Sequence, residues 1–399
     1  MAGRRSQYNS HNPVVSRSRL TPHQLEVVKK PSGENRVVIG PAGSGKTQVL
    51  IHRAAYLAEA GKVPLEKYLL FVFTDIARDY LGSALTRFNL SRDSVITFDN
   101  WCRLFFENNI SRDLPRTYIN LRVDYTKIRL KVLEELRRRK ELHNMLKFAL
   151  VDDGQDLALE AFEILKMTAR HITVFADFQQ KIVENPTTES TISDTLQTGG
   201  VRDSLLGTHR NSLQVAKLAS YFISEERAKQ DYLNRSAARK KIKKLPQCFS
   251  APSLEKEMDL LAETLKMRLS RNERVGIIVP TPLLLHNLVK ELKKRGVPVE
   301  KAIEPDAQNV FHDAFDFENN VPKIATNHTA KGLTFDSVFL PQLTEEGFLK
   351  FNSPTRLRML FMGIARARKR VYLSTVKGKE LQEFNTLNKA KEHGHLLML

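Results

Sequence analysis

The octapeptide G-P-A-G-S-G-K-T at residues 40–47 decides the fold of this 399-residue chain. It follows the apolar run 37–39 and precedes a helical pattern, which is the strand–loop–helix order of a phosphate-binding P-loop. Glycines let the backbone curl so that successive N–H groups point at phosphate oxygens, and the positive end of the helix dipole adds to them. A nucleoside triphosphate is therefore expected, with Lys46 at its β- and γ-phosphates and Thr47 on Mg²⁺. The expected binding residues are Gly40, Pro41, Ala42, Gly43, Ser44, Gly45, Lys46 and Thr47.

The net charge points to a polyanionic partner. The formal charge is +18 and the pI is near 9.8, which is the electrostatic footprint of a nucleic-acid binder. A generally basic surface or attraction to anionic lipid would also account for charge alone. The basic clusters are spread along the chain, at residues 137–140, 239–244, 293–295 and 366–370, so a basic tail does not explain them.

Composition is that of a globular protein. The chain is 41% hydrophobic and 27% charged, and its length suits about two to three domains. No apolar run approaches the ~20 residues that cross a bilayer, and the first ten residues lack the apolar core of a signal peptide. We therefore expect a cytoplasmic protein with no membrane partner. Cys102 and Cys248 are isolated in the sequence, which argues against a disulfide framework or a zinc site.

Apolar strand-like runs alternate with helical patterns, which is typical of an α/β fold with parallel sheets covered by helices. The first series of expected strands lies at 37–39, 68–73, 148–151 and 172–175. After a polar stretch at 185–200, a second series lies at 275–279, 323–326, 337–340 and 371–374. We predict a basic flexible arm over 1–19, one domain over 20–200 and a second domain over 201–399.

A group of carboxylates follows the third expected strand. The run F-A-L-V is followed by D-D-G-Q-D at 152–156, so a buried strand would deliver acids to its carboxyl end, where Mg²⁺ and the attacking water of a P-loop enzyme lie. Asp152 is the expected Mg²⁺ ligand beside Thr47. Asp153 is placed to orient or deprotonate water, and Gln155 can couple the site to a neighbouring element. An exposed acidic turn is the alternative for this pattern taken alone.

Taken together and in order, the motifs resemble those of the superfamily 1A helicases of the UvrD/Rep/PcrA group. They are L-T-P-H-Q (20–24), the P-loop, F-V-F-T-D (71–75), T-F-D-N-W (97–101), V-D-D-G-Q-D (151–156), A-D-F-Q-Q (176–180), T-H-R-N-S (208–212), T-N-H-T-A-K-G-L-T-F (326–335) and F-M-G-I-A-R-A-R (361–368). The resemblance covers nearly the whole chain. It implies two RecA-like P-loop NTPase domains and an ATP- and Mg²⁺-dependent helicase that moves 3′ to 5′ on a single strand.

The resemblance also implies roles at the nucleotide. Gln24 would recognise the adenine edge, His209 would stack beside the base, and Gly332 would line the site. The residues implied in catalysis are Lys46, Asp152, Asp153, Gln180, Arg210 and Arg366. Gln180 would sense the γ-phosphate, and the two arginines would contact it from the second domain. Closure of the two domains would then complete the site.

Strand contacts follow from the same resemblance. The residues expected to touch nucleic acid are Phe73, Thr74, Thr97, Trp101, His328 and Thr329. By residue type alone, Phe73 and Trp101 suit a hydrophobic core equally well, and His328 and Arg366 can have purely structural roles.

The chain departs from the family pattern at several positions. Asp153 stands where the family has glutamate, and a misplacement of a catalytic group near 1 Å can cost on the order of 10²-fold in rate. Lys181 follows the glutamine of A-D-F-Q-Q where an aromatic residue is usual. Thr334 replaces a usual glutamate, and Ala365 replaces a usual threonine.

Both inserted subdomains of the family are reduced here. About 45 residues separate Trp101 from Phe148, so the first insertion would be a small helical unit at about 102–147. About 20 residues separate Glu300 from Lys323, which leaves no room for a large second insertion. A protein partner could replace the missing part.

Two functional hypotheses follow. The first is a translocase or helicase on single-stranded DNA, with RNA as the less favoured substrate. The second is an ATP-gated nucleic-acid clamp or a regulatory subunit of a larger complex, such as a nuclease or an anti-phage system, with weak or no unwinding. The full set of catalytic residues favours the first, and Asp153 with the reduced insertions favours the second. The basic charge argues against a P-loop enzyme that acts on a small molecule.

Overall fold

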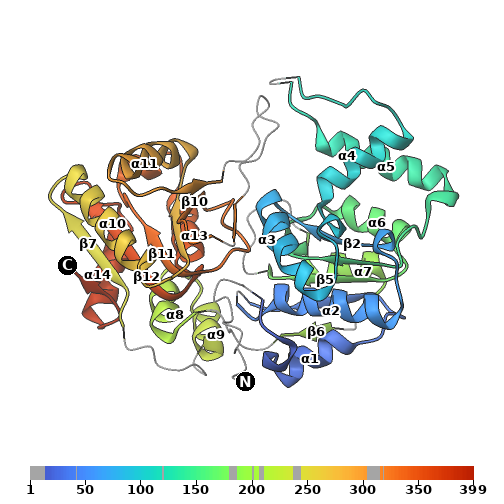
Figure 1. Cartoon of the computed structure of the whole chain (residues 1–399), viewed down its shortest axis with the longest axis horizontal. Helices are drawn as coiled ribbons and strands as arrows, with labels where there is room; N and C mark the ends of the chain where they lie inside the picture. The colour runs from blue at the N-terminus through green and yellow to red at the C-terminus, as the bar shows by residue number, and fades with distance from the viewer. Residues whose placement is uncertain are drawn as a thin grey trace, which may run out of the picture.

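The computed structural model describes residues 14–399, except 42, 119–120, 179–186, 200–201, 206–210, 237–243, 303–314 and 318. The described residues form two sheets, of six strands in the order β3-β2-β4-β5-β1-β6 and of seven in the order β13-β7-β12-β11-β8-β10-β9. Strand pairs within both sheets are parallel. Figure 1 shows the sheets side by side, each covered by helices. The predicted α/β fold is confirmed.

The first sheet forms where the apolar runs were expected. Its strands are β1 (Arg36–Ile39), β2 (Tyr68–Val72), β3 (Val95–Thr97), β4 (Phe148–Val151), β5 (Ile172–Ala176) and β6 (Arg202–Ser204). Its helices are α1 (Pro22–Lys29), α2 (Lys46–Ala60), α3 (Asp75–Leu85), α4 (Phe98–Asn109), α5 (Tyr125–Arg138), α6 (Leu159–Thr168) and α7 (Glu189–Leu196). Every residue of β4 and β5 is buried, as helices on both faces of a parallel sheet require.

The second sheet follows the same alternation. Its strands are β7 (Gln247–Ala251), β8 (Val275–Val279), β9 (Glu300–Lys301), β10 (Lys323–Thr326), β11 (Phe335–Leu340), β12 (Ala367–Val376) and β13 (Leu397–Met398). The helices are α8 (Leu213–Ser220), α9 (Glu226–Ser236), α10 (Leu254–Leu269), α11 (Pro282–Lys294), α12 (Glu345–Phe348), α13 (Ser353–Ile364) and α14 (Phe384–Glu392). In the part of the chain that is described, no helix is both long and apolar enough to cross a membrane.

Two expected boundaries shift in the structure. Strand β6 pairs with β1, so the first sheet extends past the expected division between residues 200 and 201, which itself lies outside the described residues. At the other end, residues 1–13 lie outside the described residues, but 14–19 contact α2 rather than extending as a flexible arm. The Val15 amide donates to Gln48 (2.9 Å), and the His52 ring lies 3.0 Å from the Val15 carbonyl.

The expected insertion at about 102–147 is built from α4 and α5. Its inner face is apolar, and Ile128, Val132 and Leu136 of α5 are buried in one cluster with Phe106 and Phe162. Between β9 and β10 only residues 302–322 intervene, and part of that segment lies outside the described residues.

Helix α3 joins the two halves of the molecule. It follows β2 in the first half, yet Ile76 and Tyr80 belong to the same buried cluster as Phe315 and Leu333 of the second. The Tyr80 and Phe317 rings lie 5.1 Å apart. Figure 1 shows α3 on the side of the first sheet that faces the second. The contact between the two halves, called the seam below, therefore includes packed apolar side chains.

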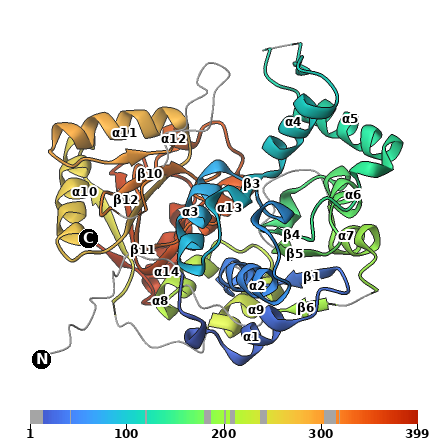
Figure 2. The same ribbon diagram turned by 45° about the vertical axis from the view of Figure 1, so that its right-hand side comes forward.

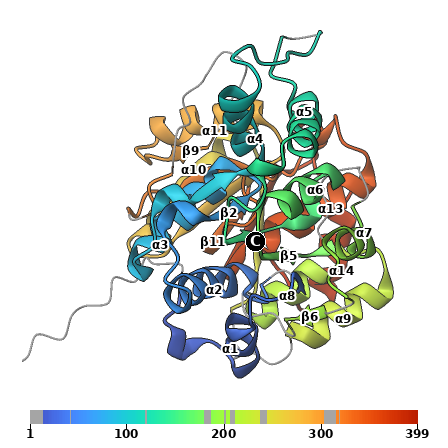
Figure 3. The ribbon, with the colours of Figure 1, turned by 90° about the vertical axis from the view of Figure 1, so that its right-hand side faces the viewer.

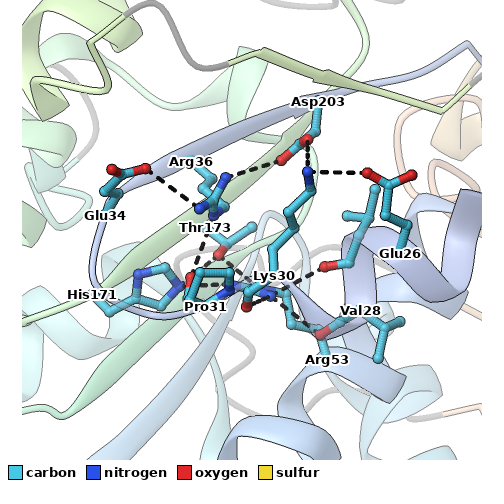
Figure 4. Close-up of polar contacts among 11 residues, drawn as sticks. Glu26, Val28, Lys30, Pro31, Glu34, Arg36, Arg53, His171, Thr173 and Asp203 are labelled. Carbon is cyan, nitrogen blue, oxygen red and sulfur yellow. Dashed lines mark hydrogen bonds and ion pairs between the residues drawn. The ribbon is translucent and has the colours of Figure 1, made fainter.

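A buried polar network fastens α1 to the sheet (Figure 4). The side chain of Arg53 on α2 is fully buried and donates to the carbonyls of Val28 (3.2 Å) and Lys30 (2.8 Å), which the end of α1 leaves without helical partners. It also donates to Thr173 (3.0 Å) and to the His171 ring (2.9 Å) on the strand side. Since α1 also carries Gln24, this network sets the position of that glutamine.

The His171 ring must stay neutral in this network. Burial, and then the charges of Arg53 and Arg36, lower the pKa of His171 to about 3, against about 6.5 in an unfolded chain. A lowered folded-state pKa contributes stability that is present above the unfolded value and is lost as pH falls toward the folded value.

We predict that wild type loses unfolding free energy relative to His171→Gln as pH falls below about 6.5, by up to about 1.4 kcal/mol per pH unit. Thermal unfolding followed by circular dichroism from pH 7.5 to pH 4.5 measures this. The exposed His286→Gln on α11 is the matched control and should track wild type. Parallel melting curves for wild type and His171→Gln across that range would refute the assignment.

Candidate nucleotide site at the seam of the two sheets

The P-loop between β1 and α2 has the shape of an anion cradle. Gly43 and Gly45 have φ of 80° and 92°, which glycine adopts without strain. A Cβ on Gly40 would lie 2.3 Å from Ser44 Oγ, and one on Gly45 would lie 2.5 Å from Gln24 Nε2, so a larger residue at either position would displace one of these side chains. Helix α2 begins at Lys46 without a side-chain cap, which leaves its first N–H groups for an anion. Ala42 lies outside the described residues.

Lys46 lies folded against the loop. Its ammonium donates to the carbonyls of Gly40 (2.8 Å) and Pro41 (3.3 Å) and lies 3.7 Å from an oxygen of Asp177. The residue is only 8% exposed. These oxygens accept hydrogen bonds from the ammonium or pair with its charge, as phosphate oxygens would.

Thr47 and Asp152 meet as predicted for a Mg²⁺ site. The Thr47 hydroxyl donates to Asp152 Oδ2 (2.8 Å). The other oxygen, Oδ1, is buried and has no hydrogen-bond partner among the described residues. Burial and the neighbouring Asp153 raise the pKa of Asp152 to about 6. A hydroxyl and a carboxylate with an unused oxygen are hard donors of the kind that Mg²⁺ takes while keeping most of its waters, so these residues fit the ion.

Asp153 points toward the second half of the molecule. Its backbone is left-handed, with φ of 52°, and its Oδ1 accepts from Gln155 Nε2 (3.2 Å). A Cβ on Gly332 would lie 4.0 Å from Asp153 Oδ2, which places that expected nucleotide residue beside the acid. Burial disfavours the ionised acid, but the charges of Lys331 and Lys46 outweigh it, so the pKa of Asp153 is lowered. Asp153 is therefore ionised and able to accept a hydrogen bond from water.

Gln155 links the acids to the end of β5. Its carboxamide oxygen accepts from the Asp177 amide (2.8 Å), and its nitrogen donates to Asp153 and to Asp156 (3.0 Å). These bonds connect the acids to the end of β5, and a coupling role for Gln155 during hydrolysis stays a prediction. Gln180, at the end of the same segment, lies outside the described residues.

Gln24 lies directly on the P-loop. Its Nε2 donates to the Ser44 carbonyl (2.9 Å), and its Oε1 accepts from the Thr21 amide (3.0 Å), which completes a capping box on α1. The position suits a residue beside the nucleotide. Recognition of adenine stays a prediction, as does stacking by His209, which lies outside the described residues.

Sequence reasoning missed a buried ion pair at the seam. The Lys331 ammonium contacts Asp156 Oδ2 across the seam, and the two side chains are 2% and 0% exposed. The same ammonium lies 5.7 Å from the centre of the Phe73 ring, and that ring lies 5.5 Å from His328. A pocket between the halves is lined by Thr47, Asp152, Asp153, Phe73, Lys331 and Gly332. Both partners lie inside motifs already recognised, but nothing in either motif indicates that they pair.

Of the two arginines expected at the γ-phosphate, the structure describes only Arg366. Arg366 is 2% exposed and donates from Nε to the Met362 carbonyl (3.1 Å). Its charge contributes to the lowered pKa of Asp153, so it lies within electrostatic reach of the site. Arg210 lies outside the described residues. A role for either arginine at the γ-phosphate stays a prediction.

The expected strand residues divide into two groups. Phe73 and His328 meet at the seam and are half-buried, and their contact with a strand stays a prediction. Trp101 instead packs against Phe71, Phe98 and Phe105, with ring centres 6.0, 6.2 and 5.4 Å away. The structure thus places Trp101 at the edge of the first core, which is the structural alternative for this residue.

Local structure occupies the three threonine hydroxyls expected at the strand. Thr74 and Thr97 accept from the backbone amides of Ala77 (3.2 Å) and Asn100 (3.3 Å) as caps of α3 and α4. The Thr329 hydroxyl bonds that of Thr326, and the residue is 2% exposed. As placed, the Thr329 side chain cannot contact a strand, so any contact there would use its backbone.

Two models of known domain families match separate parts of the chain. Residues 20–116 match the model of the UvrD/REP helicase N-terminal domain, and residues 300–378 match that of the UvrD-like helicase C-terminal domain. No curated protein matches the chain. The crystal structure of the C-terminal domain of a possible DNA helicase from Lactobacillus plantarum is 19% identical over 47% of this chain and 97% of its own, with a TM-score of 0.35.

We predict that Asp152→Asn removes the gain in ATP affinity that Mg²⁺ provides. Without the ionised oxygen, the variant should bind a fluorescent ATP analogue equally well in Mg²⁺ and in EDTA, whereas wild type should bind roughly tenfold or more tightly in Mg²⁺. The exposed Asp93→Asn is the control and should behave as wild type. A Mg²⁺ gain retained in Asp152→Asn would exclude this carboxylate as a ligand.

A second prediction concerns Lys331 and Asp156. Removal of either partner leaves a buried charge uncompensated. Lys331→Met and Asp156→Asn should therefore each lower ATP turnover by roughly tenfold or more, although neither variant changes Lys46 or the P-loop. Because they act through one contact, the double variant should be no slower than the slower single variant. Steady-state ATPase of the four proteins checks this. Losses that multiply in the double variant would show that the two residues act independently.

Proposed function

We propose that this chain, in which residues 20–116 and 300–378 match models of the two UvrD-like helicase domains, is an ATP- and Mg²⁺-dependent motor. It translocates 3′ to 5′ on a single strand, with DNA preferred over RNA. The observation that carries the proposal is the seam, where the Thr47–Asp152 pair of one half lies beside Lys331 and Gly332 of the other. Because the residues of this nucleotide site come from both halves, the site is complete only when the halves are close together.

The chain's own residues divide the work of hydrolysis. The P-loop amides and Lys46 would hold the β- and γ-phosphates, and Thr47 and Asp152 would hold Mg²⁺. Mg²⁺, when bound, neutralises charge that develops on the phosphate oxygens. Asp153, kept ionised by Lys331 and Lys46, is placed to orient the attacking water. Arg366 would supply positive charge from the second half while the two halves are closed.

Movement along a strand follows if each half also holds nucleic acid. Phe73 belongs to the first half and His328 to the second, and their rings are 5.5 Å apart in this closed arrangement. Opening of the seam after hydrolysis would separate them. Repeated closing and opening would then shift one half along the strand relative to the other.

The alternative function is an ATP-gated clamp or regulatory subunit that binds a strand and signals to a partner, with weak or no unwinding. Two observations favour it. Asp153 is one methylene shorter than the usual glutamate, and only residues 302–322 separate β9 from β10. In that case a partner protein would supply the missing subdomain.

We predict that single-stranded DNA raises ATP turnover by roughly tenfold or more, and that Lys46→Ala abolishes turnover, because the ammonium is the main charge at the phosphates. A duplex with a 3′ tail should be separated and one with a 5′ tail should not. The exposed Lys350→Ala is the control, and the same assay with RNA tests the preference for DNA.

The outcomes separate the two functions. ATP turnover that no strand stimulates would reject the motor. Strand binding that depends on ATP, with no separation of either duplex, would support the clamp instead.

A further inference from the structure

Asn211 is a buried polar side chain that lies two residues before helix α8. It is 0% exposed, and its carboxamide nitrogen donates to two backbone carbonyls, those of Ala365 (3.0 Å) and Ala367 (2.6 Å). Because a carbonyl can only accept, both bonds must come from the NH₂ group, and this fixes the orientation of the amide. Asn211 therefore uses both of its donor hydrogens on the chain at either side of Arg366.

Arg366 lies in the short turn that joins α13 to β12. The last carbonyls of a helix have no partner within the helix, and Asn211 supplies one for Ala365. The Arg366 amide donates to the Gly363 carbonyl (3.1 Å), and the Arg366 carbonyl accepts from the Phe335 amide (3.0 Å). The backbone of this arginine is thus bonded directly, and its two neighbours in the chain are bonded by one side chain.

The segment that carries Asn211 is itself fixed to the same region. The Ser212 amide donates to the Arg368 carbonyl (2.9 Å). Helices α8 and α13 lie side by side, as Figures 2 and 3 show from two directions, and Val215 of α8 and Ile364 of α13 belong to one buried cluster. Asn211 therefore reaches the turn from a packed support, so it can restrain the turn.

The contact depends on an amide at this position. A serine hydroxyl has one donor hydrogen and could serve only one carbonyl, whereas an aspartate would bring acceptors against acceptors. Alanine would leave both buried carbonyls without this donor. The pocket at the seam is lined by other residues, so an effect of Asn211 on that pocket would pass through the turn.

We propose that Asn211 is a positioning residue for ATP hydrolysis, which holds the turn so that the Arg366 guanidinium lies correctly for the γ-phosphate. The proposal rests on the proposed function, in which Arg366 supplies charge from the second half. Arg366 is 2% exposed and donates from Nε to the Met362 carbonyl, so its buried side chain has little room to compensate for a shift of the turn. A misplacement of a catalytic group near 1 Å can cost on the order of 10²-fold in rate.

Steady-state ATPase of the full chain, without nucleic acid, tests the proposal in wild type, Asn211→Ser, Arg366→Ala and the double variant. Asn211→Ser should lower kcat by roughly tenfold or more and leave KM within about twofold, because the positioned charge acts in the transition state. Arg366→Ala should lower kcat at least as far. The double variant should be no slower than Arg366→Ala, since no guanidinium is left to position. Asn211→Asp, which keeps the size of the side chain, should lower kcat as Asn211→Ser does.

Ser212→Ala is the matched control. The Ser212 hydroxyl caps α8 by accepting from the Val215 amide (3.4 Å), and the residue is buried beside Asn211. The variant therefore loses a stabilising bond at the same place but keeps both bonds from Asn211 to the turn. It should retain kcat within about twofold, and thermal unfolding followed by circular dichroism compares its stability with that of the Asn211 variants.

The possible results are distinct. Wild-type kcat in both Asn211 variants, a further loss in the double variant, or an equal loss in Ser212→Ala would overturn the positioning role and leave the motor standing. Wild-type kcat in Arg366→Ala would reject the role of that arginine and the positioning role with it. An ATPase that no strand stimulates, with no further loss in the double variant, would reject the motor and leave the positioning role standing.

Discussion

The contact between Lys331 and Asp156 is the interaction on which the site depends. Burying two charges costs several kcal/mol for each ion, and their attraction offsets this only while they stay paired. When the seam opens, water can solvate both groups, so the closed and open arrangements can be close in free energy. Such a balance suits a site whose two halves must part and rejoin. The same lysine lies near Asp153 and against Phe73, and therefore connects the nucleotide side with the strand side.

Apolar packing limits how the seam can open. Helix α3 belongs to the first half by chain order, but Ile76 and Tyr80 lie in the core of the second. Its first turn is capped by Thr74, directly after Phe73. Any movement of the halves must therefore carry α3 with one of them or slide the two faces across each other. Motion at α3 would reach Phe73 directly, which gives the seam a mechanical link to the proposed strand contact.

Far from the seam, a second buried network holds the other wall of the nucleotide site. Arg53 joins the end of α1 to β5 and keeps the His171 ring neutral. Through α1 it holds Gln24 against the Ser44 carbonyl of the P-loop. The Gln24 side of the nucleotide site is thus held by a network within the first half. The opposite side depends on the Lys331–Asp156 ion pair between the halves. Such a site can open on one side while the other side stays in place.

The sequence by itself determined the P-loop, the parallel sheets, the Thr47–Asp152 pair and the ordered motifs, because these depend on local residue order and on strands that end at one edge. It did not determine that Lys331 pairs with Asp156, that Arg53 holds α1, or that Trp101 packs inward, and it placed the end of the first domain before β6. Only the tertiary structure decided these, because each depends on which distant segments meet and on the burial that the meeting imposes. Burial changes the roles of the same side chains, and local sequence does not specify it.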